Sequence, residues 1–139
     1  MQVQTFITLC DGGFLAFAIT MLESLRAHFP TCRCYILCLD EGAYNYLRSF
    51  GRKWICPIQL KEIETPELLK VKEERTKREY CWTLSSQCFE AVRKLCPEAE
   101  SITYLDADMF FLRSPIELFD ELEKEKKSVL ITDHHYAPE

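Results

Sequence analysis

The chain has 139 residues, of which 47% are hydrophobic and 28% are charged, a composition typical of one globular domain rather than of a disordered segment. Its formal net charge is −5, so no excess of basic residues favours non-specific binding to nucleic acid. No stretch reaches the ~18 consecutive apolar residues of a membrane span, and the N-terminus lacks the pattern of a signal peptide. We therefore expect a cytoplasmic protein without a transmembrane segment.

Strand and helix patterns alternate along the chain. A run of β-branched and apolar residues over Val3–Cys10 stops at Asp11-Gly12-Gly13, and an amphipathic helix pattern follows over Phe14–Phe29. Strands are further predicted over residues 34–39, 53–60, 102–106 and 128–132, and helices over 40–50, 68–77, 85–95 and 114–125. This order predicts an α/β fold with a mostly parallel sheet and helices on both faces.

Two polar motifs directly follow predicted strands, Asp11-Gly12-Gly13 after the first and Asp106-Ala107-Asp108 after the strand at 102–106. The carboxyl ends of parallel strands meet at one edge of a sheet, and ligands of such sheets bind beyond that edge. We therefore expect both motifs to border one ligand site.

The pair Asp106 and Asp108 predicts a metal site. Side chains two residues apart in an extended segment point the same way, so both carboxylates can converge on one point. The apolar run Phe110-Phe111-Leu112 follows at once, and two like charges in apolar surroundings need a neutralising cation. An all-oxygen site suits Mg²⁺, Mn²⁺ or Ca²⁺, and Mg²⁺ is often held by carboxylates together with substrate phosphates. An Asp-x-Asp after a strand is also a common turn or cap, so the tripeptide alone favours the turn, and it is the apolar flanks that shift the interpretation to the metal.

The eight cysteines lack a C-x-x-C pair, which removes the usual signature of a zinc ribbon or a thioredoxin-type redox motif. Most of them lie within apolar strand or helix patterns, where free cysteine packs as a small hydrophobe. Cys32, Cys34 and Cys38 fit one face of a strand. We expect all eight to be free and structural.

Three segments give the chain a family resemblance. They are Thr5–Phe14, which leads into a helix, Arg78–Ser86, and Ile102–Phe111 with its Asp-Ala-Asp. Together they resemble the nucleotide-binding portion of a GT-A-type, Rossmann-like glycosyltransferase, close to the bacterial nucleotide-sugar transferases of glycosyltransferase family 8. The resemblance covers nearly the whole chain, and the third segment is its most specific part.

The resemblance implies roles for individual residues. Asp11 would contact the nucleotide base, Asp108 would be the main metal ligand and Asp106 a shared ligand; without the resemblance, Asp11 beside glycines is best interpreted as a turn or cap residue. The further donor-binding residues that it implies are Leu9, Gly12, Arg78 and Ala107. The cofactor would be Mn²⁺ or Mg²⁺, the donor a nucleotide-diphosphate sugar, foremost a UDP-sugar, and the acceptor a saccharide or a lipid-linked molecule.

The chain departs from the family pattern in two places. Ser85 and Ser86 stand where members often carry an arginine, for which Arg78 is the candidate substitute. The acceptor-binding half and a later metal-binding histidine would lie beyond Glu139. We therefore expect residues 1–139 to form a single nucleotide-sugar-binding domain, the N-terminal part of a longer hexosyltransferase-type enzyme. Alone it would be inactive, with exposed apolar surface favouring self-association.

Two other functions compete with sugar transfer. In a haloacid-dehalogenase-type phosphatase, Asp106 would be the nucleophile and Asp108 the general acid–base. That family usually carries its Asp-x-Asp in the first strand, with Thr or Val where Phe110 stands here. The third interpretation is a non-catalytic nucleotide- or metal-binding module.

Overall fold

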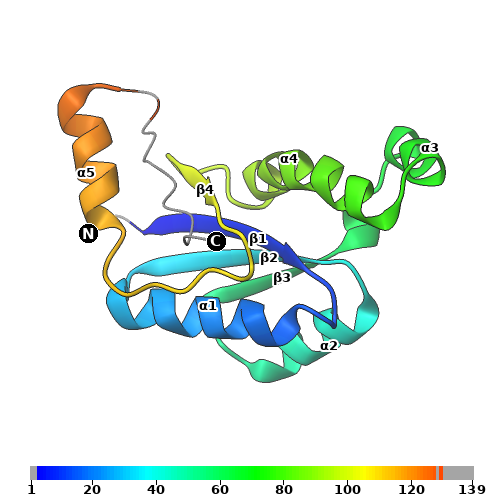
Figure 1. Ribbon diagram of the computed structural model, residues 1–139, viewed down its shortest axis with the longest axis horizontal. Coiled ribbons are helices and arrows are strands. Elements are labelled where there is room, and N and C mark those ends of the chain that lie inside the picture. The colour runs from blue at the N-terminus through cyan, green and yellow to red at the C-terminus, as the bar shows by residue number, and fades with distance from the viewer. Residues whose placement is uncertain (1–2, 128, 130–139) are drawn as a thin grey trace, which may run out of the picture.

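The computed structural model of the chain describes residues 3–127 and 129 (Figure 1). Its strands form one parallel four-stranded sheet in the order β3-β2-β1-β4. The strands are β1 (Gln4–Cys10), β2 (Cys32–Cys38), β3 (Ile55–Gln59) and β4 (Ile102–Tyr104). The predicted α/β class is confirmed, and the described strands are all parallel. Apart from Val129, the predicted strand 128–132 lies outside the described residues.

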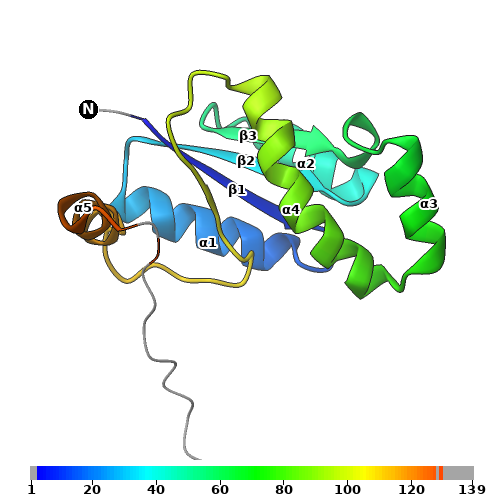
Figure 2. The same cartoon turned by 90° about the horizontal axis from the view of Figure 1, so that it is seen from above.

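Helices cover both faces of this sheet. In Figures 1 and 2, α1 (Leu15–His28) and α2 (Glu41–Phe50) lie on one face and α4 (Lys77–Leu95) crosses the other. The remaining helices are the short 3-10 turn η1 (Leu60–Glu62), α3 (Pro66–Glu74) and α5 (Ile116–Glu125). The chain thus places α1 and α2 on one side, and then changes side before it returns to β4 next to β1.

The core consists of two apolar layers, one on each face of the sheet, because successive strand residues point to opposite faces. On the α1 face, Phe6 packs with the helix residues Leu22 and Leu25. On the α4 face, Ile7 packs with Leu84 and other buried residues of that helix. The helix α5 contributes Phe119, whose ring centroid lies 6.2 Å from that of Phe6.

The predicted boundaries of the third and fourth helices are wrong. The structure ends α3 at Glu74 and begins α4 at Lys77, eight residues before the predicted start at Ser85. The cause is a capping box, in which the Glu79 amide donates to the Thr76 hydroxyl at 3.4 Å and the Thr76 amide donates to the Glu79 carboxylate at 2.9 Å. The signal Thr76-x-x-Glu79 is present in the sequence, within a run of mixed charges.

The eight cysteines, all within the described residues, form no disulfide, and Cys32, Cys34 and Cys38 lie buried in the same apolar layer as predicted. No helix among the described residues is long and apolar enough to cross a bilayer.

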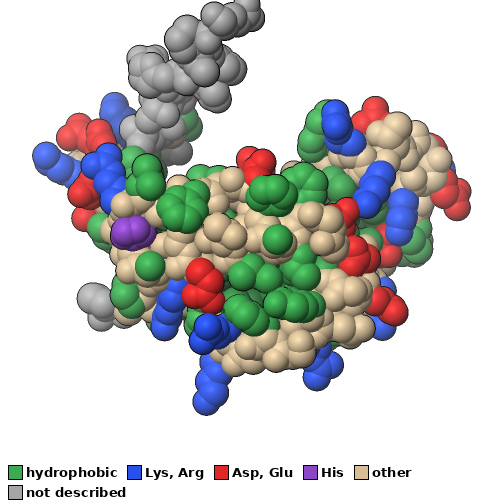
Figure 3. Space-filling view, turned by 60° about the horizontal axis from the view of Figure 1, so that its bottom comes forward, with side chains coloured by type: hydrophobic (Ala, Val, Ile, Leu, Met, Phe, Trp, Pro, Cys, Tyr) green, Lys and Arg blue, Asp and Glu red, His purple; other side chains and the backbone are tan. Residues whose placement is uncertain are grey.

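Apolar side chains also gather on the outer surface of the layer formed by α1 and α2 (Figure 3). The exposed rings of Phe14 and Phe17 lie 5.8 Å apart at the start of α1, and Tyr46 of α2 is half exposed. Self-association through such a surface stays a prediction.

Candidate functional site

The turn after β1 places Asp11 at the carboxyl end of the sheet. One carboxylate oxygen, Oδ1, accepts from the Phe14 amide at 3.1 Å, and Oδ2 accepts from the Lys77 ammonium at 2.6 Å. The Lys77 ammonium is the main reason why the pKa of Asp11 is lowered, and the Phe14 amide adds to it. Asp11 is thus a turn-forming residue, as its position beside glycines predicts, and it also forms an ion pair with α4.

A second acid, Asp40, holds the same turn from the end of β2. Its Oδ1 accepts from the Ala43 amide at 2.8 Å, which caps α2, and its Oδ2 accepts from the Gly12 amide at 2.7 Å. These two amides lower the pKa of Asp40. The cap was predictable from the sequence. The bond to Gly12 was not, because it joins residues 28 positions apart that only the pairing of β1 with β2 brings together.

The acids Asp106 and Asp108 lie in a turn after β4, because the strand ends two residues before its predicted end at Asp106. The strand β4 ends at Tyr104, one further sheet bond runs from the Leu105 amide to the Ile7 carbonyl at 2.9 Å, and the Met109 amide closes the turn onto the Asp106 carbonyl at 3.3 Å.

Burial alternates through this turn. Leu105 and Ala107 are 7% and 8% exposed, whereas both aspartates are exposed. The two carboxylates therefore share the outer side of the turn. The two carboxylates do not lie in the predicted apolar surroundings, because Phe110 and Leu112 are 62% and 82% exposed and do not cover them.

The loop that follows the acids is attached to α1. The Phe111 amide donates to the Ser24 hydroxyl at 3.1 Å, and that hydroxyl donates to the Met21 carbonyl at 2.7 Å. Ser24 is 7% exposed, so a buried polar side chain of α1 fixes the backbone three residues after Asp108. Figure 1 shows this loop running along α1 on its way to α5.

Both motifs border one cleft of about 680 Å³ at the carboxyl ends of the strands. Of the predicted site residues, the structure brings six together there: Leu9, Asp11, Arg78, Asp106, Ala107 and Asp108. Gly12 does not line the cleft, because its amide faces Asp40. The sheet order places this cleft between β1 and β4, where the chain changes from one face of the sheet to the other, and open α/β sheets bind ligands at such points.

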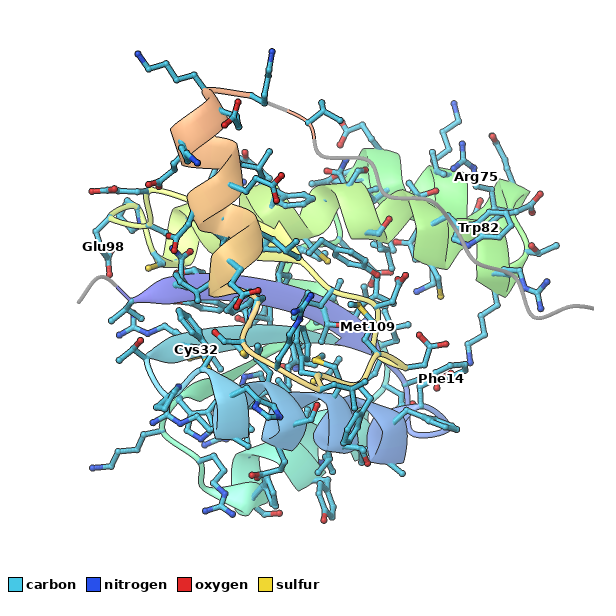
Figure 4. All side chains as sticks on the ribbon, turned by 60° about the vertical axis from the view of Figure 1, so that its left-hand side comes forward. Phe14, Cys32, Arg75, Trp82, Glu98 and Met109 are labelled. Carbon is cyan, nitrogen blue, oxygen red and sulfur yellow. The ribbon has the colours of Figure 1, made fainter. Side chains whose placement is uncertain are left out.

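The opposite wall of the cleft is formed by α4, which contributes Lys77, Arg78, Cys81, Trp82 and Ser85. Trp82 is 66% exposed, an unusual position for the most apolar of these side chains. In Figure 4 it lies toward the same side of the view as Phe14, which also lines the cleft. Lys77 and Trp82 were not among the predicted site residues, because the predicted boundaries put Lys77 at the end of one helix and Trp82 in the gap before the next.

The lining of the cleft combines acidic groups with two cationic side chains, Lys77 and Arg78. Tyr104 lies between the acids and α4, and burial together with the adjacent charge of Asp106 raises its pKa. Within residues 3–127 no three His, Cys, Asp or Glu side chains come together as a complete set of metal ligands. Two exposed carboxylates are too few for a metal that is bound by protein ligands alone. They suit Mg²⁺ or Mn²⁺, which keep several coordination positions for water or phosphate oxygens.

Comparison with known proteins finds similar sequences without a known activity. The uncharacterized protein YfnD of Bacillus subtilis (strain 168) is 35% identical over 138 residues, which make up 99% of this chain and 44% of YfnD. The uncharacterized protein YfnF of the same organism is 33% identical over 119 residues, or 86% of this chain and 39% of YfnF. The chain therefore spans less than half the length of these curated relatives.

No family model matches the chain. Among solved structures, the apo-form glycosyltransferase GlyE of Streptococcus pneumoniae TIGR4 matches with 17% identity and a TM-score of 0.47, over 86% of this chain and 26% of that one. At this degree of similarity, neither the fold nor the activity of GlyE carries over to this chain.

Proposed function

We propose that the cleft binds a nucleotide-diphosphate sugar together with Mn²⁺ or Mg²⁺, and that the protein is a glycosyltransferase. The observation that carries the proposal is the meeting of Asp11, Asp106 and Asp108 in one cleft at the point where the chain changes faces. The two motifs lie in segments about 95 residues apart in the sequence that both contribute to the resemblance to family 8-like transferases, and in the fold they border the same cleft.

Each part of the cleft has a chemical role in this proposal. Asp106 and Asp108 would hold the metal ion, which when bound neutralises the diphosphate and so stabilises the leaving nucleoside diphosphate. Asp11, at the end of β1, would accept a hydrogen bond from the base. Lys77 and Arg78 would face the phosphates from α4. Transfer to a saccharide or lipid-linked acceptor, and the UDP-sugar as preferred donor, rest on the resemblance alone.

The test is calorimetric titration of the 139-residue chain with UDP and GDP, with and without Mn²⁺. We expect nucleotide binding that requires the metal. The Asp108→Asn variant should bind Mn²⁺ with UDP at least about tenfold more weakly, since loss of a group that only orients a metal ligand already lowers metal affinity about 10- to 100-fold. Asp11→Asn should weaken Mn²⁺ binding less. Asp120→Asn is the matched control, because Asp120 is an exposed aspartate on α5 away from the cleft.

A phosphatase assay on the same protein tests the alternative. Hydrolysis of a phosphomonoester that is abolished by Asp106→Asn, without metal-dependent binding of UDP, would replace our proposal by the phosphatase. Equal Mn²⁺ affinity in wild type and the Asp106→Asn/Asp108→Asn double variant would exclude both.

A further inference from the structure

The turn that carries Asp11 consists largely of glycine, and glycine backbone has the widest conformational freedom of any residue. Gly12 and Gly13 separate Asp11 from α1, so the direction of the Asp11 carboxylate depends on what holds this turn as well as on its own bonds to Phe14 and Lys77. Two backbone bonds restrain its ends, from the Leu39 amide to the Cys10 carbonyl at 2.9 Å and from the Phe14 amide to the Asp11 carbonyl at 3.1 Å. The second of these bonds holds the carbonyl side of the peptide between Asp11 and Gly12, and neither of them engages its N–H side.

The N–H side of that peptide is held by Asp40. The Gly12 amide belongs to the peptide group that directly follows the Asp11 α-carbon, and it donates to Asp40 Oδ2 at 2.7 Å, a short charge-assisted bond. A methyl group built on Gly12 would lie 3.5 Å from the same oxygen, so the carboxylate rests directly against this residue. The other oxygen of Asp40 is engaged by the first turn of α2, which fixes the carboxylate in place.

We infer that Asp40 is a positioning residue of the candidate site: it clamps the Gly12 peptide and thereby orients Asp11 toward the ligand. Asp40 itself does not line the cleft, and both of its oxygens are bonded to backbone amides, so it acts through Asp11 rather than on the ligand. For nucleotide binding, the inference rests on the proposed function. The part of the inference that concerns the arrangement of the turn does not depend on the proposed function.

The two tasks of Asp40 can be separated by one substitution. Serine is as good a helix cap as aspartate, so Asp40→Ser keeps an acceptor for the Ala43 amide and preserves the start of α2. Its single, shorter hydroxyl leaves nothing for the Gly12 amide. The control is Thr65→Ala, because Thr65 caps α3 by accepting from the Leu68 amide at 3.3 Å and makes no bond to the cleft.

Two measurements on the full 139-residue chain test the inference. The first is the rate of exchange with water of the Gly12 and Phe14 amides by NMR. In Asp40→Ser both should exchange at least about threefold faster. The Phe14 amide is the critical reporter, since it bonds to Asp11 and not to Asp40. The second is the affinity for UDP with Mn²⁺, which should fall about fivefold to tenfold, because only a fraction of molecules then holds Asp11 in the competent direction. Thr65→Ala should change neither.

The outcomes distinguish the two proposals. Unchanged Phe14 exchange in Asp40→Ser overturns the inference whatever the nucleotide does, and so does unchanged UDP affinity where wild type binds. If wild type binds no nucleotide, the proposed function fails, and faster exchange of both amides still supports the clamp on Asp11. A melting temperature of Asp40→Ser as low as that of Thr65→Ala would mean that the cap of α2 was lost. The variant Asp40→Asn, which also keeps one acceptor oxygen, then has to show the faster amide exchange and the weaker UDP binding, or the inference is wrong.

Discussion

Replacing Ser24 by alanine removes a side-chain hydrogen bond that joins α1 to the loop after Asp106-Ala107-Asp108. The hydroxyl accepts from the Phe111 amide at 3.1 Å, and both groups are at least partly buried. Leaving such a donor without a partner costs about 1–3 kcal/mol, with the lower half of this range appropriate for a partly buried amide. Alanine is the better helix former by about 0.5 kcal/mol, which offsets part of the loss.

The expected net loss is about 1 kcal/mol of unfolding free energy, which lowers the melting temperature by about 4 °C for a domain of this size. The matched control is Ser49→Ala, since Ser49 makes the same kind of bond to the carbonyl three residues before it, at 2.8 Å from Tyr46, but no long-range bond. That exposed substitution should stay within about 0.5 kcal/mol of wild type.

Chemical denaturation gives both free energies, and amide exchange measured by NMR gives the protection of Phe111. Ser24→Ala should expose the Phe111 amide selectively and, because the neighbouring acids then lose their support, weaken Mn²⁺ binding. Equal stability of the two serine variants, or a destabilised Ser24→Ala that keeps full protection of Phe111, would refute the reasoning.

Two further predictions concern charge and thiol chemistry. Lys77→Ala should raise the pKa of Asp11 toward its usual value of 3.8, measured from the carboxyl carbon by NMR, and an unchanged midpoint would contradict the ion pair. Because a lowered carboxyl pKa stabilises the fold above that usual value, the stabilisation due to Lys77 should be present at neutral pH and disappear as the pH falls through the pKa of folded Asp11. Alkylation of the native protein should modify Cys56 and Cys81 first, since the other cysteines are buried, and the denatured, unreduced protein should take up eight adducts. Fewer than eight would show that some thiols are oxidised or blocked.

Local sequence patterns predicted the elements well where one pattern dominates. The alternating β-branched run of β1 and the helical spacing of α1 gave boundaries within about one residue, because burial of one face fixes both. The start of α4 was missed since the capping box at Thr76 lies among mixed charges that were interpreted as the solvated face of one helix over residues 68–77. A capping box consists of two reciprocal hydrogen bonds, and the spacing of hydrophobic residues does not reveal it.

The site was predictable only as far as strand ends are predictable. Asp11 and Asp106 could be assigned to one edge of the sheet, because each follows a parallel strand. The contacts that hold them could not, since Asp40 reaches Gly12 and Ser24 reaches Phe111 only after β2 and α1 have packed. The burial of the acids was also wrong, because the apolar residues after Asp108 turn outward rather than back over the carboxylates.

The exposed indole on α4 gives the molecule a built-in optical signal. The chain has two tryptophans, of which Trp82 lies in the cleft and Trp54 precedes β3 at the opposite, amino end of the sheet. Trp54 is half buried beneath the guanidinium of Arg26, at 5.3 Å from the ring centroid, so its emission depends on the packing of the far edge. Trp82 is mainly surrounded by water, and a ligand that fills the cleft must displace part of that water and shift the emission to shorter wavelength. A Trp54→Phe protein therefore carries its single tryptophan at the cleft, and the wavelength of its emission reports ligand binding without an added label.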